Sequence, residues 1–394
     1  MNNLSPHNRS TVKAALSVLL ALSALAASAQ ELVIPDRWKK SLTSVPGIFK
    51  EDTLTIMIMG DVMMHENQIR SARKDGTYDF SSYFSLISDE IQDADIAVAN
   101  MEFTLAGEPY SGYPCFSAPD ESAYYLADCG FDVFLAANNH IFDKGTEGAE
   151  RTLTKYRELV ETKGIRFTGI AGNKEELNGN TPLFIRKKGM KVAFVNATYG
   201  TNIGLPDKWP QTVRLASEDI MSAALSEAEK ADITIALPHW GTEYALAHSR
   251  VQETRAGWMA EKGADIIVGA HPHVIQDFQI LETSEGKHVP VAYSLGNAVS
   301  NMSAANTQLE LMATIKIVRK TNGDIVTLPL EFTYLWCSRP GGYNDSYTVI
   351  PVEEHIGRKG MWKNGWDYDK MMATYRHVAE TTGIKDKSYN NINE

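Results

Sequence analysis

The chain has 394 residues, of which 43% are hydrophobic and 22% charged, and its formal net charge is −11. This length allows one large domain or two smaller ones, and the composition is that of an ordinary globular protein. The acidic balance argues against a sequence-independent nucleic-acid binder, which needs a basic surface for phosphates. It is compatible with a local basic pocket for an acidic substrate.

The first 29 residues have the pattern of a secretory signal peptide. Two basic residues precede a largely apolar stretch at 14–25, and Ala27-Ser28-Ala29 fits the small-x-small cleavage pattern. The alternative is an uncleaved membrane anchor, but the apolar stretch is short for a bilayer span. We therefore expect an exported protein, periplasmic or extracellular after cleavage near Ala29, with residues 30–50 as a linker.

Short apolar runs follow the linker, and each is typical of a strand buried on both faces. These runs are 54–59, 96–99, 133–136, 192–195, 233–237, 266–268 and 291–293. Helical patterns lie between them, at 81–92, 122–129, 146–163, 217–230 and 251–262. The alternation predicts an α/β protein with a layered sheet and helices outside it.

The pattern changes after residue 300. Residues 309–318 and 325–335 alternate in polarity, which predicts a hairpin around Asn322-Gly323. Residues 367–382 predict a final helix. We therefore expect a main domain that ends at residue 335.

This division gives a main domain over residues 51–335 and a short C-terminal extension over 336–394 with one helix.

The three cysteines are Cys115, Cys129 and Cys337. An odd count leaves at least one thiol unpaired within the chain, and a Cys115–Cys129 bond stays open. The sparse spacing excludes a thiolate zinc cluster.

Polar residues that can carry chemistry fall directly after the apolar runs. In open α/β sheets ligands bind outside the carboxyl ends of the strands, so we expect these side chains to share one edge. In chain order they are Gly60-Asp61, Asn100-Met101-Glu102, Asn138-Asn139-His140 with Asp143, His239-Trp240-Gly241-Thr242-Glu243-Tyr244, His271-Pro272-His273 and Ser294-Leu295-Gly296-Asn297.

Each residue taken singly has an ordinary explanation, because a lone Asp is usually a cap or turn residue and a lone His is usually structural. Burying many of them together is costly unless they are paired or bind metal. Nitrogen and oxygen ligands without thiolate suit Zn, Mn, Fe or Ni. On an extended chain His271 and His273 point to the same side, so one imidazole could serve each ion of a close pair.

The order of these motifs resembles the CapA (PgsA) proteins of poly-γ-glutamate capsule biosynthesis, in the calcineurin-like metallophosphoesterase superfamily. The resemblance covers roughly residues 54 to 300. It implies a metallophosphoesterase-like layered β-sandwich flanked by helices, with two divalent transition metal ions (Zn, Mn or Fe). The implied ligands are Asp61 and His273 for the first ion, Asn139, His239 and His271 for the second, and Glu102 as the bridge.

His140 is the catalytic acid that the resemblance implies, either protonating a leaving oxygen or holding an oxyanion. Further residues are expected around the ligands or the substrate: His65, Asp143, Glu243 and Asn297. Asp143 and Glu243 could orient imidazoles or act only in caps and turns.

The chain departs from the family pattern near its first motif. The superfamily usually has Asp-x-His there, whereas Val62 and Met63 follow Asp61. CapA proteins also commonly carry Gly-Arg shortly after this Asp, where this chain has His65-Glu66.

Two functions fit these observations. The first is a metal-dependent hydrolase that acts on an ester or amide bond of an extracytoplasmic polymer, or on a phosphorylated or γ-glutamyl substrate. The second is a non-catalytic assembly factor that binds an anionic polymer during export, together with capsule-synthesis machinery. A binding protein with a purely structural metal is disfavoured, because structural zinc sites are normally saturated by four protein ligands and leave no spare acid.

Overall fold

The structure is a computed structural model that describes residues 51–204 and 206–385. The predicted signal peptide and the whole of the predicted linker lie outside the described residues. Asp52–Val318 and the residues from Ile325 onward form one compact unit, which contains the site. Among the described helices, none has the length and hydropathy needed to cross a membrane.

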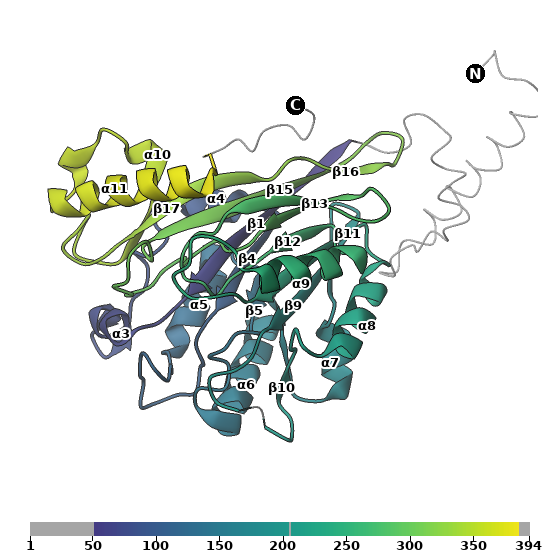
Figure 1. The fold of residues 1–394 in the computed structure, drawn as a ribbon. Coiled ribbons are helices and arrows are strands. Elements are labelled where there is room, and N and C mark those ends of the chain that lie inside the picture. Colours follow the sequence, from purple (N-terminus) through teal and green to yellow (C-terminus); the bar gives the residue numbers. More distant parts are fainter. Residues whose placement is uncertain (1–50, 205, 386–394) are drawn as a thin grey trace, which may run out of the picture. The chain divides into compact units, whose positions relative to one another are not determined.

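The larger sheet has eight strands in the order β18-β17-β15-β1-β4-β5-β6, with β16 paired to β15 (Figure 1). Strands β1, β4, β5 and β6 are parallel, whereas β17 runs antiparallel to both of its neighbours, β15 and β18. The bounds are β1 (Asp52–Val62), β4 (Ile96–Met101), β5 (Val133–Leu135), β6 (Arg166–Thr168), β15 (Leu309–Arg319), β16 (Ile325–Thr327), β17 (Glu331–Ser338) and β18 (Thr348–Pro351).

The smaller sheet has six strands in the order β13-β14-β12-β11-β9-β8. Its inner strands are parallel, and β8 and β13 are antiparallel edge strands. The bounds are β8 (Leu183–Lys187), β9 (Met190–Thr198), β11 (Ile233–His239), β12 (Ile266–Val268), β13 (Phe278–Glu282) and β14 (His288–Ala292). Two small pairs complete the strands: β2 (Arg73–Lys74) with β3 (Thr77–Tyr78), and β7 (Ile170–Ala171) with β10 (Gln211–Thr212).

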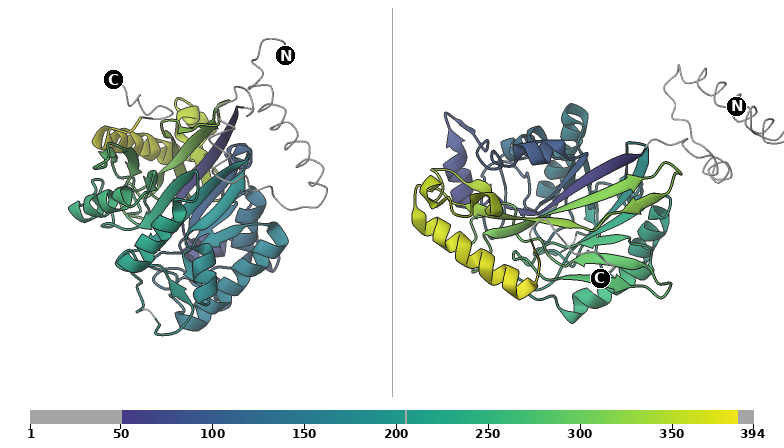
Figure 2. Two further views of the ribbon diagram at one scale, coloured as in Figure 1. Left: turned by 90° about the vertical axis from the view of Figure 1, so that its right-hand side faces the viewer. Right: turned by 90° about the horizontal axis from the view of Figure 1, so that it is seen from above.

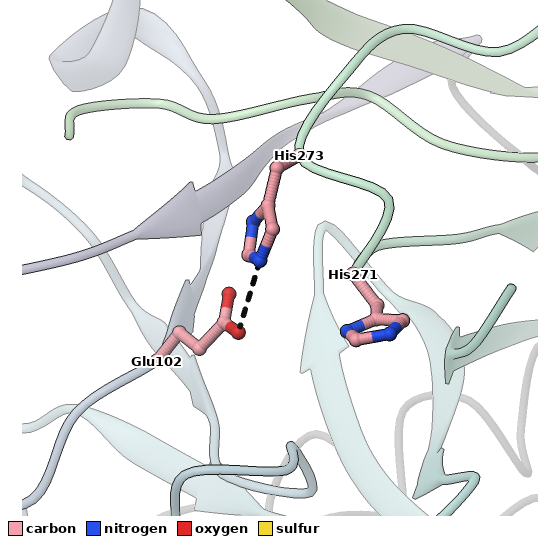
Figure 3. A group of neighbouring side chains, drawn as sticks. All are labelled: Glu102, His271 and His273. Carbon is pink, nitrogen blue, oxygen red and sulfur yellow. Dashed lines mark ion pairs between the residues drawn. The ribbon is translucent and has the colours of Figure 1, made fainter. Parts of the chain in front are cut away.

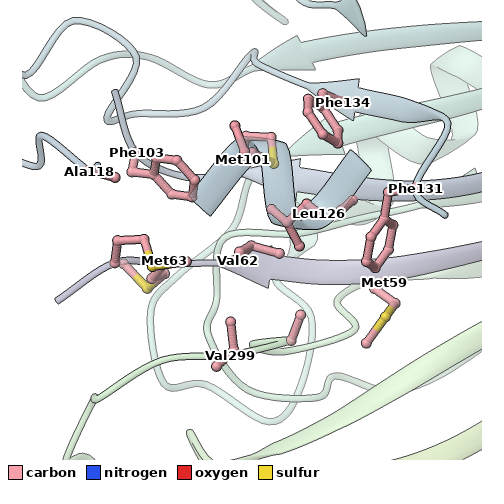
Figure 4. Close-up of a cluster of buried hydrophobic side chains, with 14 of the residues drawn as sticks. Met59, Val62, Met63, Met101, Phe103, Ala118, Leu126, Phe131, Phe134 and Val299 are labelled. Atoms are coloured by element: carbon pink, nitrogen blue, oxygen red, sulfur yellow. The ribbon is translucent and has the colours of Figure 1, made fainter. Parts of the chain in front are cut away.

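Alternation along the strands divides the hydrophobic core into three layers. In β1, Ile56 and Ile58 pack into a core shared by both sheets, whereas Met57 and Met59 face the opposite side. That opposite side is covered by helices, and Figure 4 shows part of this cluster. A third cluster lies between the smaller sheet and its helices. The fold is therefore a two-sheet sandwich flanked by helices (Figure 2).

The helices on the larger sheet are α3 (Glu66–Ala72), α4 (Ser88–Asp93), α5 (Asp120–Cys129) and α6 (Gly145–Lys163). Those on the smaller sheet are α8 (Glu218–Ala228) and α9 (Arg250–Glu261). The remaining helices are α7 (Lys174–Asn180), α10 (Val352–His355), the 3-10 helix η1 (Lys359–Met361) and α11 (Gly365–Thr382).

The predicted layered α/β class is confirmed, and the differences are local. The helix predicted at 81–92 begins only at Ser88, because turns occupy the residues before it. Helices α3 and α7 and strand β13 have no counterpart in the prediction, whereas β14 overlaps the predicted strand at 291–293. All three cysteines are free thiols, two of them buried.

The predicted C-terminal extension needs correction, because it is built into the larger sheet. The boundary proposed at 335/336 falls inside β17, and β18 pairs antiparallel with β17. The segment carries α10 and η1 in addition to α11. Helix α11 adds Met371 and Val378 to the core that the two sheets share. The predicted hairpin of 309–318 and 325–335 is confirmed, because β15 pairs antiparallel with β17. The sequence pattern does not indicate that β17 also pairs with β18.

Asp367 fixes this C-terminal segment, and its removal provides a test. One carboxylate oxygen, Oδ2, accepts hydrogen bonds from Trp336 Nε1 at 3.3 Å, Trp362 Nε1 at 3.2 Å and Ser338 Oγ at 2.6 Å. We expect Asp367→Ala to lower the free energy of unfolding by about 3 kcal/mol, because it leaves buried donors without an acceptor. Asp367→Asn should cost less. Denaturant unfolding measures both, and a loss below about 1 kcal/mol for Asp367→Ala would contradict this role.

Candidate metal centre

The site lies where the carboxyl ends of strands from both sheets meet. The larger sheet contributes residues at the ends of β1, β4 and β5, and the smaller sheet those at the ends of β11, β12 and β14. The predicted ligands and the predicted acid are all at most 3% exposed. They are Asp61, Glu102, Asn139, His140, His239, His271 and His273.

A bulge in β1 sets the position of Asp61. The register between β1 and β4 shifts between Ile58 and Asp61, and the shift re-aims the following side chain. Gly60 lies within this stretch, where a Cβ would stand 2.0 Å from the carbonyl oxygen of Gly296. The Asp61 N–H donates to the same carbonyl at 3.0 Å. Only glycine at position 60 lets this strand and the segment at Gly296 approach closely enough to hold Asp61 at the sheet edge.

Asp61 is a buried, fully paired carboxylate. It accepts hydrogen bonds from Asn100 Nδ2 at 2.7 Å and from the His271 N–H at 3.1 Å, and Nδ1 of His273 lies 3.2 Å away. Burial alone would raise the pKa of this carboxyl. The hydrogen bond with His273 and the charges of His239 and His273 outweigh burial and hold the pKa well below its ordinary value. The surroundings of Asp61 therefore favour its ionised form.

Glu102 is buried among imidazoles without a hydrogen bond to either carboxylate oxygen. Its Oε1 lies 3.6 Å from Nε2 of His239, 3.8 Å from Nε2 of His273 and 3.9 Å from Nε2 of His140. Burial, and then the negative charge of Asp61, raise the pKa of Glu102 well above its ordinary value. A carboxylate in this position is costly unless a cation accompanies it.

His239, at the end of β11 in the smaller sheet, contacts two residues contributed by the larger sheet. Its Nε2 lies 2.7 Å from Asn139 Oδ1, and its Nδ1 lies 3.2 Å from Asn100 Nδ2. Burial and the neighbouring His271 lower the pKa of His239 well below its ordinary value. This shift favours the neutral ring, which is the form of imidazole that binds a metal.

His271-Pro272-His273 forms a turn, which corrects the extended geometry assumed from the sequence. His271 has φ +100° and His273 has φ +58°, both in the left-handed region. Such backbone conformations are costly for side chains with a Cβ and concentrate at functional sites. The two rings still face the same centre, with centroids 5.7 Å apart. Figure 3 shows His273 pointing toward Glu102.

The two imidazoles differ in their surroundings. Nδ1 of His273 lies 2.9 Å from Asn297 Oδ1, and burial is outweighed by the bond to Asp61, so the pKa of His273 is raised. Nδ1 of His271 is buried without a partner, and burial lowers the pKa of His271 to about 3. Asn297 thus contacts the His273 ring, and its role around the ligands stays a prediction.

The residues present fit divalent metal ions. Two groups of side chains have ligand atoms within 4.8 Å of one another: Glu102 with His271 and His273, and Asp61 with Glu102 and His239. Glu102 belongs to both groups, as a bridging acid must. The unpartnered oxygens of Glu102 and the unpartnered Nδ1 of His271 are the atoms that a cation would satisfy. The division of ligands between two ions stays a prediction.

His140 lies beside the candidate ligands and outside both groups. Its Nδ1 lies 2.7 Å from Asp143 Oδ2, and that oxygen also accepts the Phe116 N–H at 2.7 Å. Nε2 is directed toward Glu102. A hydrogen bond at Nδ1 fixes the ring and leaves Nε2 to exchange a proton with a substrate. Asp143 therefore occupies the position of an orienting carboxylate.

His65 and Glu243 lie outside the two ligand groups. Nδ1 of His65 is 3.1 Å from Gln68 Oε1 at the start of α3, and burial lowers the pKa of His65 to about 4. Glu243 is exposed in the loop after β11. In the same loop Trp240 is a core residue whose Nε1 donates to Tyr293 O at 2.9 Å, whereas Tyr244 is exposed.

Asn100 stands in a predicted motif without an assigned role, and Glu310 stands in none. Asn100 donates to Asp61 and contacts His239. It lies two residues before Glu102, and the period of a strand could have indicated a shared face. Glu310, on β15, is buried and its Oε1 accepts the Gly60 N–H at 2.7 Å. No local signal identifies Glu310, because its partner is 250 positions away in the chain.

The two-sheet sandwich with a buried carboxylate–imidazole centre defines a candidate metalloprotein of the α/β class. The sequence profile of the family described as bacterial capsule synthesis protein PGA_cap matches residues 55–302. The chain belongs to this family.

Similar proteins carry related names. The chain is 28% identical over 349 residues to the capsule biosynthesis protein CapA of Bacillus anthracis, covering 84% of this chain and 80% of that protein. It is 25% identical over 295 residues to the PGA biosynthesis protein CapA of Bacillus subtilis (strain 168), covering 72% and 73%.

Solved structures show a more distant likeness. The Haemophilus influenzae NAD nucleotidase has a TM-score of 0.45 and 15% identity, covering 84% of this chain and 68% of that one. A putative 5'-nucleotidase from Staphylococcus aureus has a TM-score of 0.44 and 15% identity, covering 79% and 58%.

Metal content tests the bridging position of Glu102. We expect Glu102→Gln to weaken metal binding by at least about 100-fold, because loss of even an outer partner of a ligand costs ~10–100-fold. Asp367→Asn is a matched control, since it neutralises another buried carboxyl, one that belongs to the C-terminal segment and to neither ligand group. Elemental analysis and calorimetric titration with Zn²⁺ and Mn²⁺ measure both variants. Equal metal content in Glu102→Gln and wild type would exclude the bridge.

Proposed function

We propose that this protein is a metal-dependent hydrolase of capsule or poly-γ-glutamate-type polymer biosynthesis. Its substrate would be an ester or amide bond of the polymer or of a phosphorylated or γ-glutamyl precursor. The observation that carries the proposal is the pairing of a shared buried carboxylate, Glu102, with an imidazole, His140, that is oriented by Asp143 and belongs to neither ligand group. A purely structural metal site has no use for that arrangement.

The chain's residues have separable roles in this proposal. Asp61, Glu102, His239, His271 and His273 would hold the ions, with Asn139 beside His239. When bound, a pair of divalent ions supplies Lewis-acid activation of the substrate and of a water molecule.

His140 would act on the leaving group. With Nδ1 fixed by Asp143, its Nε2 can hold a proton near Glu102 and donate it to the departing oxygen or nitrogen. Burial of the ligands excludes bulk water and strengthens these charge interactions.

Hydrolysis assays test the proposal on the metal-loaded chain. The substrates are phosphomonoesters, phosphodiesters and γ-glutamyl peptides. We expect His140→Ala to lower kcat by ~10²–10⁴-fold with metal content retained, because general acid catalysis contributes that much. His271→Ala should lose both metal and activity. Activity of His140→Ala equal to wild type would remove this residue from the mechanism.

The non-catalytic assembly factor is the outcome to be distinguished. If metal binds and every substrate class is inert, while an anionic polymer binds, the assembly role replaces the hydrolase. The shared family and the relatives' names are equally compatible with that role.

We also propose that the protein is exported, on the basis of its N-terminal sequence pattern. The mature chain recovered outside the cytoplasm is expected to begin at Gln30. Ala29→Arg should block this processing, because cleavage needs a small residue there. N-terminal sequencing and mass measurement check both, and an intact first residue on the exported wild-type chain would contradict cleavage.

A further inference from the structure

Two exposed tyrosines stand beside the candidate metal centre. Tyr199 is 47% exposed and Tyr244 is 45% exposed. The Tyr199 ring lies 4.6 Å from the His271 ring, and the Tyr244 ring lies 6.3 Å from the His273 ring. We call Tyr199 and Tyr244 the tyrosine pair. Its two members come from different loops and contact different imidazoles of one centre.

The backbone at Tyr244 is held in a costly conformation. Its φ is +65°, which is uncommon for a bulky residue. The Tyr244 N–H donates to Pro272 O at 2.8 Å, so the residue is tied to the turn that carries His271 and His273. Strain of this kind at a site edge points to a functional position for the ring.

Glu243 makes the surroundings of the tyrosine pair negative. It is exposed, and no lysine or arginine of the described residues forms an ion pair with it. After burial, the charge of Glu243 is the largest cause that raises the pKa of Tyr199. Burial, the charge of Glu243 and a hydrogen bond to it raise the pKa of Tyr244 to about 12. The charge of Glu102 also raises the pKa of both tyrosines, by less than the charge of Glu243 does.

An exposed carboxylate beside two exposed tyrosine rings is suited to bind a cationic group. The faces of aromatic rings are negative and attract cations, and a carboxylate accepts hydrogen bonds from ammonium. We propose that Glu243 and the exposed faces of Tyr199 and Tyr244 bind an ammonium group of the substrate beside the metal centre. The inference rests on the proposed function and names its substrate class: amides or esters with a free amino group near the bond to be cleaved.

The amino end of a γ-glutamyl chain satisfies this requirement. Three carbon–carbon bonds, about 4 Å when extended, separate its ammonium-bearing carbon from the amide carbon. That reach is comparable with the 4.6 Å between the rings of Tyr199 and His271. The ammonium can therefore contact Tyr199 while the amide lies at the imidazoles. Interior segments of an anionic polymer offer no such group, so their carboxylates would face Glu243 without a neighbouring ammonium to compensate the repulsion.

Calorimetric titration of the metal-loaded mature chain tests the inference with two probes. One is tri-γ-glutamate with a free amino terminus, and the other is the same peptide acetylated at that terminus. We expect the free amine to bind about tenfold more tightly, since cation–π and charged hydrogen-bond contacts supply ~1–2 kcal/mol. The preference should disappear in Glu243→Gln and in Tyr199→Leu. It should persist in Tyr199→Phe, which keeps the ring face.

Controls separate this inference from the proposed function. Glu285→Gln removes another exposed carboxylate and should leave the amine preference unchanged. Metal content is measured in every variant. Equal affinity for the two peptides, binding of neither, or an unchanged preference in Glu243→Gln overturns the inference. An amine preference without hydrolysis overturns the proposed function alone, and hydrolysis without an amine preference overturns the inference alone.

Discussion

The buried carboxylate of Glu102 is the constraint on which the rest of the site depends. It has no hydrogen bond of its own and lies within 4 Å of three imidazole nitrogens. A charge in such a place costs several kcal/mol unless cations compensate it. The candidate ligands surround it from both sheets, and the two ligand groups overlap at this residue.

Two features of the backbone position the site residues at the sheet edge: a close approach of two segments and a turn with unfavourable φ angles. Gly60 lets β1 meet the chain at Gly296, which places Asp61, and Glu310 secures the Gly60 N–H from β15. His271 and His273 adopt left-handed conformations that a free chain would avoid. The energy of these local distortions is offset by the packed layers on either side of both sheets.

The centre and its rim have opposite electrostatic characters. Ions held by the ligands would attract a carbonyl or an anionic oxygen, whereas Glu243 and the tyrosine pair attract a cation. A substrate with both features, such as an amino-terminal γ-glutamyl residue, would be oriented by the two together. Membership in the capsule synthesis family is in keeping with such a polymer end, and it leaves the reaction to be fixed by the site.

The sequence by itself determined the α/β class and the residues that gather at the strand ends. Buried parallel strands need continuous apolar runs, and polar residues directly after them have to meet at one edge. Asp61, Glu102, His239 and His271 followed from that pattern. The sequence could not show that His271-Pro272-His273 is a turn, because its conformation depends on the Asp61 carboxylate, which accepts the His271 N–H. Only the tertiary structure shows that Glu310 contacts Gly60 and that Tyr199 lies beside His271, since these contacts join positions far apart along the chain. The pairing of β18 with β17 likewise became visible only in the structure, because no alternating pattern marks β18 as a strand.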